Sequence, residues 1–451
     1  SLVRLLLECG APLNTVDVDN MTPLHYCVKF GHKTVARQLI NAKVPIDSRV
    51  IRQAWTSEVI RSTINQEGFA LQPMLPASRS VANGLTPLHF AALTGNPTMT
   101  EFLLEHGADP NALSNSGETP LHISLRTTLY GTKYEDSWTD SSLRAEYLLD
   151  VADFDEDDVD AVLAEISLLR EGVLDALLSD PRTSLTVMDY KGESPLHCVQ
   201  YGKLESATLV QKLVSRGADP FCGNSSQQSP LHFACKASDY DSVKILLSLG
   251  AKVALTNVYG LNALHYAAQS GNHETIIVIL ETQEGRAANL AASKDKRGQN
   301  ALHHMLSTTS RKRVKTVQSL LHQGVDGSEL DNSGTSPLAR FIKSSVLRID
   351  IEICRSLLGI KGNASFVDDD GQNLGHLCAR TFDLGVHVLK VLKEHGVDLA
   401  KKDCDGRTVL HRAAICGSLA EQSLEFLVNV IGIQAGEEDA SGQTALQYAT
   451  E

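Results

Sequence analysis

Aromatic residues, long apolar runs and a secretion signal are scarce or missing in this sequence. Aromatic side chains make up 5% of its 451 residues, and no stretch approaches the ~20 apolar residues that a membrane-spanning helix needs. The first residues, Ser1 to Cys9, lack the charged start and the small-residue cleavage site of a signal peptide. With 42% hydrophobic and 21% charged residues, the composition is typical of a soluble folded protein and excludes a disordered one.

Positive charge and paired cysteines are also scarce. Lys and Arg total 41 against 54 Asp and Glu, a formal net charge of -13, and such a surface repels nucleic-acid phosphates, so we expect no nucleic-acid partner. The nine cysteines form no C-x-x-C pair, which is typical of a reducing compartment. We therefore expect an intracellular, cytoplasmic protein. One basic cluster, Arg311–Lys315, leaves a nuclear location open, although a solvated loop explains it more simply.

A short pattern recurs throughout the chain. It reads Gly, any residue, Thr or Ser, Pro, Leu, His, and the copy Gly84–Ala92 shows it clearly. A leucine-rich run closed by Gly and a small or acidic residue follows most copies, as in Phe102–Pro110. The spacing from Thr86 to Thr119 is 33 residues. Further copies, some of them weaker, begin near residues 20, 117, 192, 227, 260, 298, 334, 371, 406 and 442.

Each part of this pattern has a local physical role. Glycine suits a tight turn with positive φ. Thr or Ser then caps a helix, and Pro occupies the first helical position, where its missing N–H costs nothing. Leu and the Ala that follows face inward, and the leucine-rich run forms a second helix that Gly107 ends. Because one such helix pair cannot bury its own apolar face, stability requires stacked neighbours.

The pattern resembles the ankyrin repeat, which has a 33-residue period and a T-P-L-H-x-A core. The resemblance implies an all-α ankyrin-repeat solenoid of helix–turn–helix repeats with short β-turn tips and two long insertions. We expect ten complete repeats and a partial one at each end. The complete repeats begin near Asp19, Asn83, Ser116, Tyr190, Ser226, Tyr259, Lys296, Asn332, Asp370 and Asp405.

The interruptions of the period divide the chain into five segments. Residues 1–47 hold an N-terminal partial repeat and the first complete one, and residues 48–82 are an insertion. Residues 83–126 are repeats, and residues 127–189 are an acidic and helical insertion that includes the second helix of the preceding repeat. Residues 190–451 are C-terminal repeats, the last one truncated. Because Leu5–Leu7 and Ala445–Leu446 would expose apolar faces, we expect flanking repeats or domains of a longer chain.

Nothing in the sequence predicts a catalytic residue, a cofactor site or a metal site. Nine of the sixteen histidines occupy the same slot of the repeat, which indicates hydrogen bonds to adjoining loops rather than catalysis. His303 and His304 are adjacent and so point to different sides of a helix. The acidic run Asp153–Asp160 lacks the glycine and the twelfth-position glutamate of an EF-hand.

The resemblance implies a non-catalytic protein–protein interaction scaffold or adaptor that uses the concave face of the solenoid. The alternative is a regulatory array of a larger enzyme or ion channel whose working domain lies outside this fragment. In ankyrin proteins the turn-tip residues before the recurring glycine contact partners. Mapped onto this sequence, they are Asp19, Asn83, Ser116, Tyr190, Tyr259, Arg297 and Asp370.

Three further residues and three departures from the pattern complete these expectations. Tyr134 and Trp138, in the second insertion, either contact a partner or fold back on the insertion. The resemblance implies asparagine hydroxylation at Asn111 where the enzyme is present. Gly375 replaces a core leucine, so we expect its repeat to be the least stable. Ala339 and Gln447 replace the slot histidine.

Overall fold

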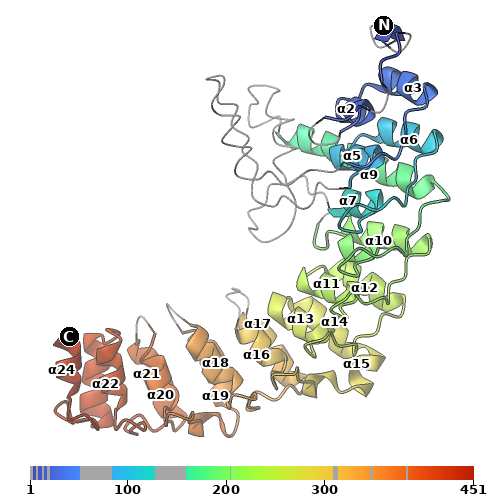
Figure 1. The fold of residues 1–451 in the computed structure, drawn as a ribbon. Helices are drawn as coiled ribbons and strands as arrows, with labels where there is room; N and C mark the ends of the chain where they lie inside the picture. The colour runs from blue at the N-terminus through green and yellow to red at the C-terminus, as the bar shows by residue number, and fades with distance from the viewer. Residues whose placement is uncertain are drawn as a thin grey trace, which may run out of the picture. The chain divides into compact units, whose positions relative to one another are not determined.

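The computed structural model describes most of the chain as paired helices (Figure 1). The described residues are 4–6, 9–12, 15–17, 21–50, 84–126, 159–203, 205–307, 313–345, 349–381 and 384–450. Within them there are ten helix pairs and no β-strand, apart from two isolated bridges at Val367–Asn373 and Glu438–Thr444. This agrees with the predicted all-α solenoid of helix pairs.

The chain divides into two compact units. Unit 1 comprises Ser1–Gln200 and Glu205–Ser225, and unit 2 comprises Tyr201–Leu204 and Ser226–Glu451. In both units the first helices of successive repeats pack in a row, and the second helices form a parallel row behind them.

Unit 1 holds four of the helix pairs. Its helices are α2 (Pro23–Lys29), α3 (Lys33–Asn41), α5 (Pro87–Thr94), α6 (Pro97–Glu105), α7 (Pro120–Arg126), α9 (Val159–Ser179), the 3-10 helix η2 (Pro195–Cys198) and α10 (Ser206–Ser215). The first helices are α2, α5, α7 and η2, and each packs against the next. Their Leu and Ala side chains form the core, with Leu24, Leu88 and Leu121 fully buried.

Unit 2 holds six pairs and one further helix. Its first helices are α11 (Pro230–Lys236), α13 (Ala263–Ser270), α16 (Ala301–Leu306), α18 (Pro337–Ser344), α20 (Leu374–Cys378), α22 (Val409–Ile415) and α24 (Ala445–Thr450). Its second helices are α12 (Tyr240–Ser248), α14 (His273–Glu281), α17 (Arg313–His322), α19 (Ile351–Leu358), α21 (Val386–Glu394) and α23 (Glu421–Glu425), which continues as the π-helix η5 (Phe426–Ile431). Short helices α15 (Gln283–Ala287), η3 (Leu290–Ala292) and η4 (Asn363–Ser365) lie in return loops.

The recurring Thr-Pro-Leu-His sequence starts the first helix of a repeat as a capping box. In α5, Thr86 is the N-cap with extended backbone, Pro87 is the first helical residue and His89 is the third. The Nδ1 atom of His89 accepts the N–H of Thr86 at 3.1 Å, which is the place that Glu or Gln takes in the usual capping box. Gly95, with φ 67°, ends the helix in the left-handed conformation.

The long second insertion separates the two helices of one repeat. Helix α9 packs against α6 and α7 and so stands as the second helix of the repeat that α7 begins. The last carbonyls of α7 receive side-chain donors from elsewhere in unit 1. The guanidinium of Arg170 donates to Ser124 O at 3.2 Å and Leu125 O at 2.8 Å, and the amide of Gln200 donates to Arg126 O at 2.7 Å. Side-chain donors of this kind satisfy carbonyls at the end of a helix.

In the repeat with Gly375, neighbouring side chains occupy the place of the missing leucine. A Cβ atom at Gly375 would lie 2.7 Å from Leu399 Cδ2 and 2.9 Å from Val409 Cγ2. Leu399 and Val409 are buried, so they fill the space of the missing leucine. The expectation that this repeat is the least stable stays a prediction.

Candidate functional site: the turn tips

The slot histidines link each repeat to the next. In the example of His89, Nδ1 also accepts the hydroxyl of Thr86 at 2.8 Å, and Nε2 donates to Glu118 O at 3.0 Å in the following repeat. Seven more slot histidines form an Nε2 bond to a backbone carbonyl at 3.0–3.3 Å: His25, His122, His232, His265, His303, His376 and His411. The acceptors of His232 and His411, Leu255 O and Glu437 O, lie in the return loops of their own repeats, and the other five acceptors lie in the following repeat. The predicted structural role of these histidines is confirmed.

This pattern of hydrogen bonds requires a neutral imidazole, since one ring nitrogen accepts and the other donates. Burial supports the same state. It lowers the pKa of His25, His89 and His265 to about 4. With both ring nitrogens occupied, these histidines are not placed to move protons for a substrate.

A residue at the start of the turn, most often Asp or Asn, holds the turn tip in place, and Ser114 takes this place in the tip at 114–117. In the tip at 295–298, Asp295 Oδ1 accepts the N–H groups of Arg297 and Gln299, both at 2.8 Å. Its Oδ2 lies 2.9 Å from His304 Nε2. The same arrangement joins Asp331 to Arg340, Asp403 to Arg412 and Asp439 to Tyr448. The sequence analysis missed these anchors, although an Asp nine residues before Arg, His or Tyr is a periodic signal.

The electrostatics of the anchors follow from these contacts. Although partial burial raises it, hydrogen bonds from Ser333, Thr335, Arg340 and Gln299 hold the pKa of Asp331 well below its usual range. Asp331 is therefore ionised at neutral pH, and its charge is balanced by Arg340 and by the N–H groups of the turn.

Neighbouring tips are also joined by backbone hydrogen bonds. In unit 1, Tyr190 N–H donates to Ser116 O at 3.1 Å. In unit 2, the bonds Lys296 N to Tyr259 O, Asn332 N to Arg297 O, Cys404 N to Asp370 O and Ala440 N to Asp405 O measure 2.9–3.0 Å. Gly260 has φ 81°, and a Cβ there would lie 2.9 Å from Lys296 N. Glycine recurs because the next tip occupies the space of a side chain.

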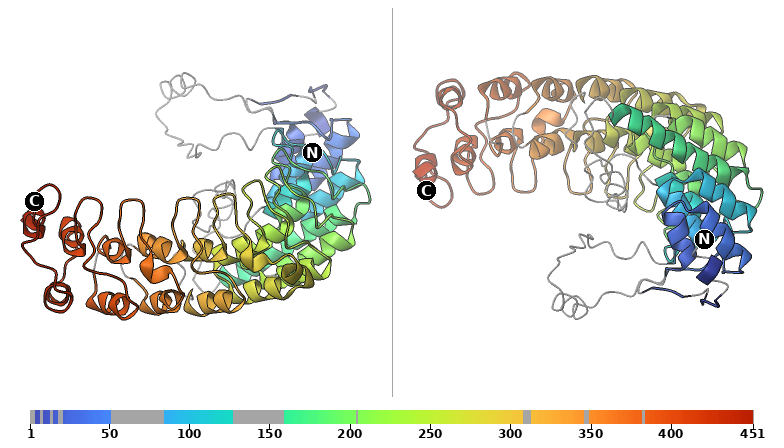
Figure 2. Two further views of the ribbon diagram at one scale, coloured as in Figure 1. Left: turned by 90° about the horizontal axis from the view of Figure 1, so that it is seen from below. Right: turned by 90° about the horizontal axis from the view of Figure 1, so that it is seen from above.

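The structure places five of the predicted binding residues on these tips. Tyr190 and Tyr259 are exposed, with 74% and 64% of their surface accessible. Arg297 and Asp370 are exposed and Ser116 is half-buried. Ser116 and Tyr190 are neighbours in unit 1 through the backbone bond, and the other three lie on separate tips of unit 2, whose loops project to one side of the helices (Figure 2). Asp19, Asn83, Tyr134 and Trp138 lie outside the described residues.

The tip carboxylates of unit 1 are gathered by one arginine. The guanidinium of Arg126 contacts Glu118 at 2.6 Å, Asp189 at 2.7 Å and Glu193, and its Nε donates to Cys198 Sγ at 3.1 Å. Burial alone would lower the pKa of Arg126, but Cys198 and the carboxylates raise the pKa by a larger amount, so the side chain stays charged. Burial also raises the pKa of Glu193. The cluster is an internal ion network rather than an open cation site.

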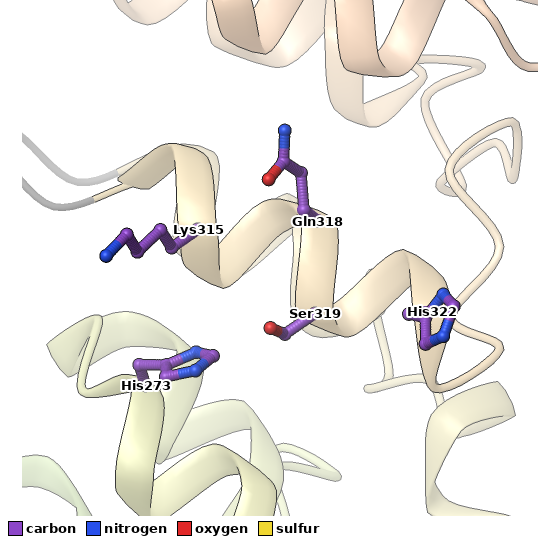
Figure 3. Close-up of a pocket in the computed structure, with 5 residues that line it drawn as sticks. All are labelled: His273, Lys315, Gln318, Ser319 and His322. Carbon is purple, nitrogen blue, oxygen red and sulfur yellow. The ribbon is translucent and has the colours of Figure 1, made fainter.

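A shallow hollow lies between the second helices α14 and α17 (Figure 3). Its lining residues are His273, Lys315, Gln318, Ser319 and His322. Ser319 points toward His273, whereas Gln318 points away from it. The side chains are spread along α17 and do not converge on one point, so the hollow lacks the arrangement of a small-molecule site.

Within the described ranges, no group of three or more His, Cys, Asp or Glu side chains is placed to hold a metal ion. The same part of the chain contains no helix long and apolar enough to cross a bilayer. Leu5, Leu6 and Leu446 are 57%, 49% and 71% exposed, as expected for the two apolar ends.

The side-chain amide of Asn111 both donates to and accepts from the backbone of a neighbouring loop. Its amide nitrogen donates to Arg182 O at 2.7 Å, and its amide oxygen accepts Ser184 N–H at 2.7 Å. Hydroxylation of Asn111 stays a prediction. These bonds mean that a modifying enzyme would have to separate the two loops first.

Comparisons with known proteins place these features among ankyrin-repeat chains. The chain is 25% identical over 443 residues to the human transient receptor potential cation channel subfamily A member 1, covering 92% of this chain and 37% of the channel. It is 24% identical over 319 residues to E3 ubiquitin-protein ligase KEG of Arabidopsis thaliana, covering 67% of this chain and 17% of the ligase. The chain therefore spans well under half of either relative.

A solved structure and family models complete the comparison. The crystal structure of the ankyrin repeat domain of Bcl-3 is 22% identical, has a TM-score of 0.36 and covers 75% of this chain and 99% of that domain. Models described as ankyrin repeats match residues 1–40, 81–124, 166–257, 196–291 and 250–331. The chain belongs to the ankyrin-repeat family.

Proposed function

We propose that this chain is a non-catalytic scaffold or adaptor that binds other proteins along its turn tips and the adjoining first helices. Ankyrin repeats mediate protein–protein interaction. The observation that carries the proposal is the pair of tyrosines at tip positions, Tyr190 and Tyr259, which are 74% and 64% exposed. Large aromatic side chains of this kind are enriched among the residues that contribute most to binding.

The tips are ordered before any partner arrives. Asp295 fixes its turn through two backbone bonds, and the Lys296 N–H to Tyr259 O bond ties the turn to its neighbour. A surface that is already fixed loses little conformational entropy on binding. This rigidity supports recognition by the tips more than by a surface that must reorganise.

The alternative function is that of a regulatory array in a larger enzyme or channel. The similarity to a cation channel over 92% of this chain favours it. In that case the tips would bind another part of the same protein. Loss of regulated activity, with basal activity kept, after substitution of Tyr259 in the full-length protein would distinguish this function from the proposed one.

The test compares proteins captured by the 451-residue chain and by its variants. The Tyr190→Ala and Tyr259→Ala chains should each lose a defined set of partners, with melting temperatures unchanged. The matched control is Tyr240→Ala, because Tyr240 lies on the second helix α12, away from the tips. Partners that are retained by both tip variants but lost by the control would contradict the proposal.

A further inference from the structure

The charges exposed on the tips of unit 2 follow an order along the chain. Each tip has an anchor Asp or Asn at its first position and Gly at its fourth, which leaves the two central residues exposed or half-buried. In chain order these central pairs are Val258–Tyr259, Lys296–Arg297, Asn332–Ser333, Asp369–Asp370, Cys404–Asp405 and Ala440–Ser441. From the first tip to the fourth, the row therefore passes from aromatic to basic, then neutral, then acidic, and the sixth tip is neutral again.

The charges of the anchor Asp residues do not change this order. The anchor carboxylates accept turn N–H groups and also contact a side chain of the first helix. These contacts are Asp295 to His304, Asp331 to Arg340 and Asp403 to Arg412. Arg340 and Arg412 offset the charges of Asp331 and Asp403. Burial lowers the pKa of His304 and keeps it neutral, so hydrogen bonds alone hold the Asp295 carboxylate. All three carboxylates are buried, so the exposed central pairs form the surface that a partner meets.

The central charges of the second and the fourth tip in this row are unpaired within the described residues. The side chains of Lys296 and Arg297 form no ion pair there, and neither do those of Asp369 and Asp370. Asp405 differs, because Arg407 and Arg412 neutralise it at 2.9 Å and 3.4 Å. Unpaired exposed charges of opposite sign on a rigid frame favour a partner of complementary charge order.

We propose that unit 2 binds an extended segment of another protein that carries the complementary order of side chains. This inference rests on the proposed function and names the chemistry of its partner. The segment would present an apolar or aromatic residue at Tyr259, acidic residues at Lys296–Arg297 and basic residues at Asp369–Asp370.

The spacing of the repeats fixes the length of this segment. Packed helices lie ~8–10 Å apart, and the basic and acidic tips are separated by two repeats, which gives roughly 20 Å. An extended chain advances ~3.3 Å per residue, so about six residues lie between the acidic and the basic positions. The aromatic position lies about three residues outside the acidic one by the same arithmetic.

The test selects random peptides from a display library on the full 451-residue chain. Enriched peptides should carry acidic and basic residues about six positions apart. Arg297→Glu should weaken the binding of the most enriched peptide about tenfold. Raised ionic strength should partly weaken the binding of the same peptide to the unsubstituted chain. Replacing the acidic residues of the peptide by Lys should restore its binding to the Arg297→Glu chain. The matched control is Lys390→Glu, an exposed position on the second helix α21, which should leave the affinity unchanged.

Other outcomes separate this inference from the proposed function. Peptides that need Tyr259 but ignore Arg297→Glu and Asp370→Lys would overturn the charge order and leave the proposed function standing. Peptides insensitive to all three substitutions would overturn both. Enrichment of no peptide would overturn the inference alone. Self-association of the purified chain that Arg297→Glu abolishes would replace the partner segment by a second copy, because a row with basic and acidic tips is complementary to itself.

Discussion

The interrupted repeat of unit 1 and the regular repeats of unit 2 solve the same problem with different residues. In unit 2, Asp331 is held by Arg340, nine residues later in its own repeat. In unit 1 the residue nine positions after Asp189 is Cys198, and Arg126 from the preceding repeat binds the carboxylate instead. In both units the anchor carboxylate therefore has an arginine partner, which comes from its own repeat in one case and from the preceding repeat in the other.

The helix ends show the same contrast. Helix α5 ends at Gly95 in the left-handed conformation within its own motif. Helix α7, which precedes the long insertion, relies on Arg170 and Gln200 for its last carbonyls. An insertion is tolerated where side chains from other helices replace the lost local bonds.

The largest expected difference between the two regions concerns their arginines. Arg126→Met leaves Glu118, Asp189 and Glu193 without their cation, and breaking a buried ion cluster costs about 3–5 kcal/mol. Arg340→Met should cost less, because it removes the cation from one carboxylate, Asp331, and not from three. Urea unfolding of both variants checks the difference, and equal losses would break the comparison.

Acidification should weaken the histidine links. The folded pKa of His89 and His265 is about 4, against ~6.5 in the unfolded chain. The unfolded state therefore binds protons first, and stability is complete above about pH 6.5 and is lost as the pH falls toward 4, by about 2 kcal/mol per histidine at pH ~5.

One repeat provides the internal control for this pH effect. Ala339 replaces the slot histidine there, and the lowered pKa of Asp331 keeps its contribution intact until the pH falls below the usual Asp range. Amide hydrogen exchange between pH 7 and 5 should show α5 losing protection while α18 keeps it. Equal loss in both helices would contradict the histidine mechanism.

The substitution Arg170→Met tests the imported helix cap. It removes two charge-assisted bonds to α7 carbonyls, so unit 1 should lose about 1.5–3 kcal/mol. The control is Arg355→Met on α19, whose 52% exposed side chain pairs only with Glu352 at 3.4 Å. A surface pair of that kind contributes little, and a similar loss in both variants would show that Arg170 is not needed as a cap.

Restoring the leucine at Gly375 should destabilise its repeat. Gly375→Leu places side-chain atoms where Leu399 and Val409 already lie, and overpacking of this kind costs about 1–3 kcal/mol. Thermal unfolding checks the sign. A more stable Gly375→Leu chain would show that the slot is empty after all.

Substitutions of exposed tip side chains should change the free energy of unfolding least. Tyr259→Ala removes a side chain that is 64% exposed, so the free energy of unfolding should change by less than about 0.5 kcal/mol. A larger loss would mean that the tyrosine serves the fold, and the binding role would need another residue.

The sequence predicted the repeats and their helix pairs because each repeat contains its own turn, cap and apolar face. It did not predict how Leu399 and Val409 fill the site of Gly375, since that depends on side chains from a loop and the next helix. The Asp anchors of unit 2 were predictable from their spacing of nine residues to Arg, His or Tyr. The partner of Asp189 was not, because Arg126 belongs to the preceding repeat. The exposure of Tyr259 and Tyr190 was predictable from their places one and two residues before a tip glycine.

The most direct test of the account is a hydrogen-exchange footprint of a captured partner on the full chain. The account predicts slower exchange at the tip amides, such as Tyr259–Gly260 and Lys296–Gly298, and no change along the second helices α14 and α17. A footprint confined to α14 and α17, with the tips unprotected, would contradict it.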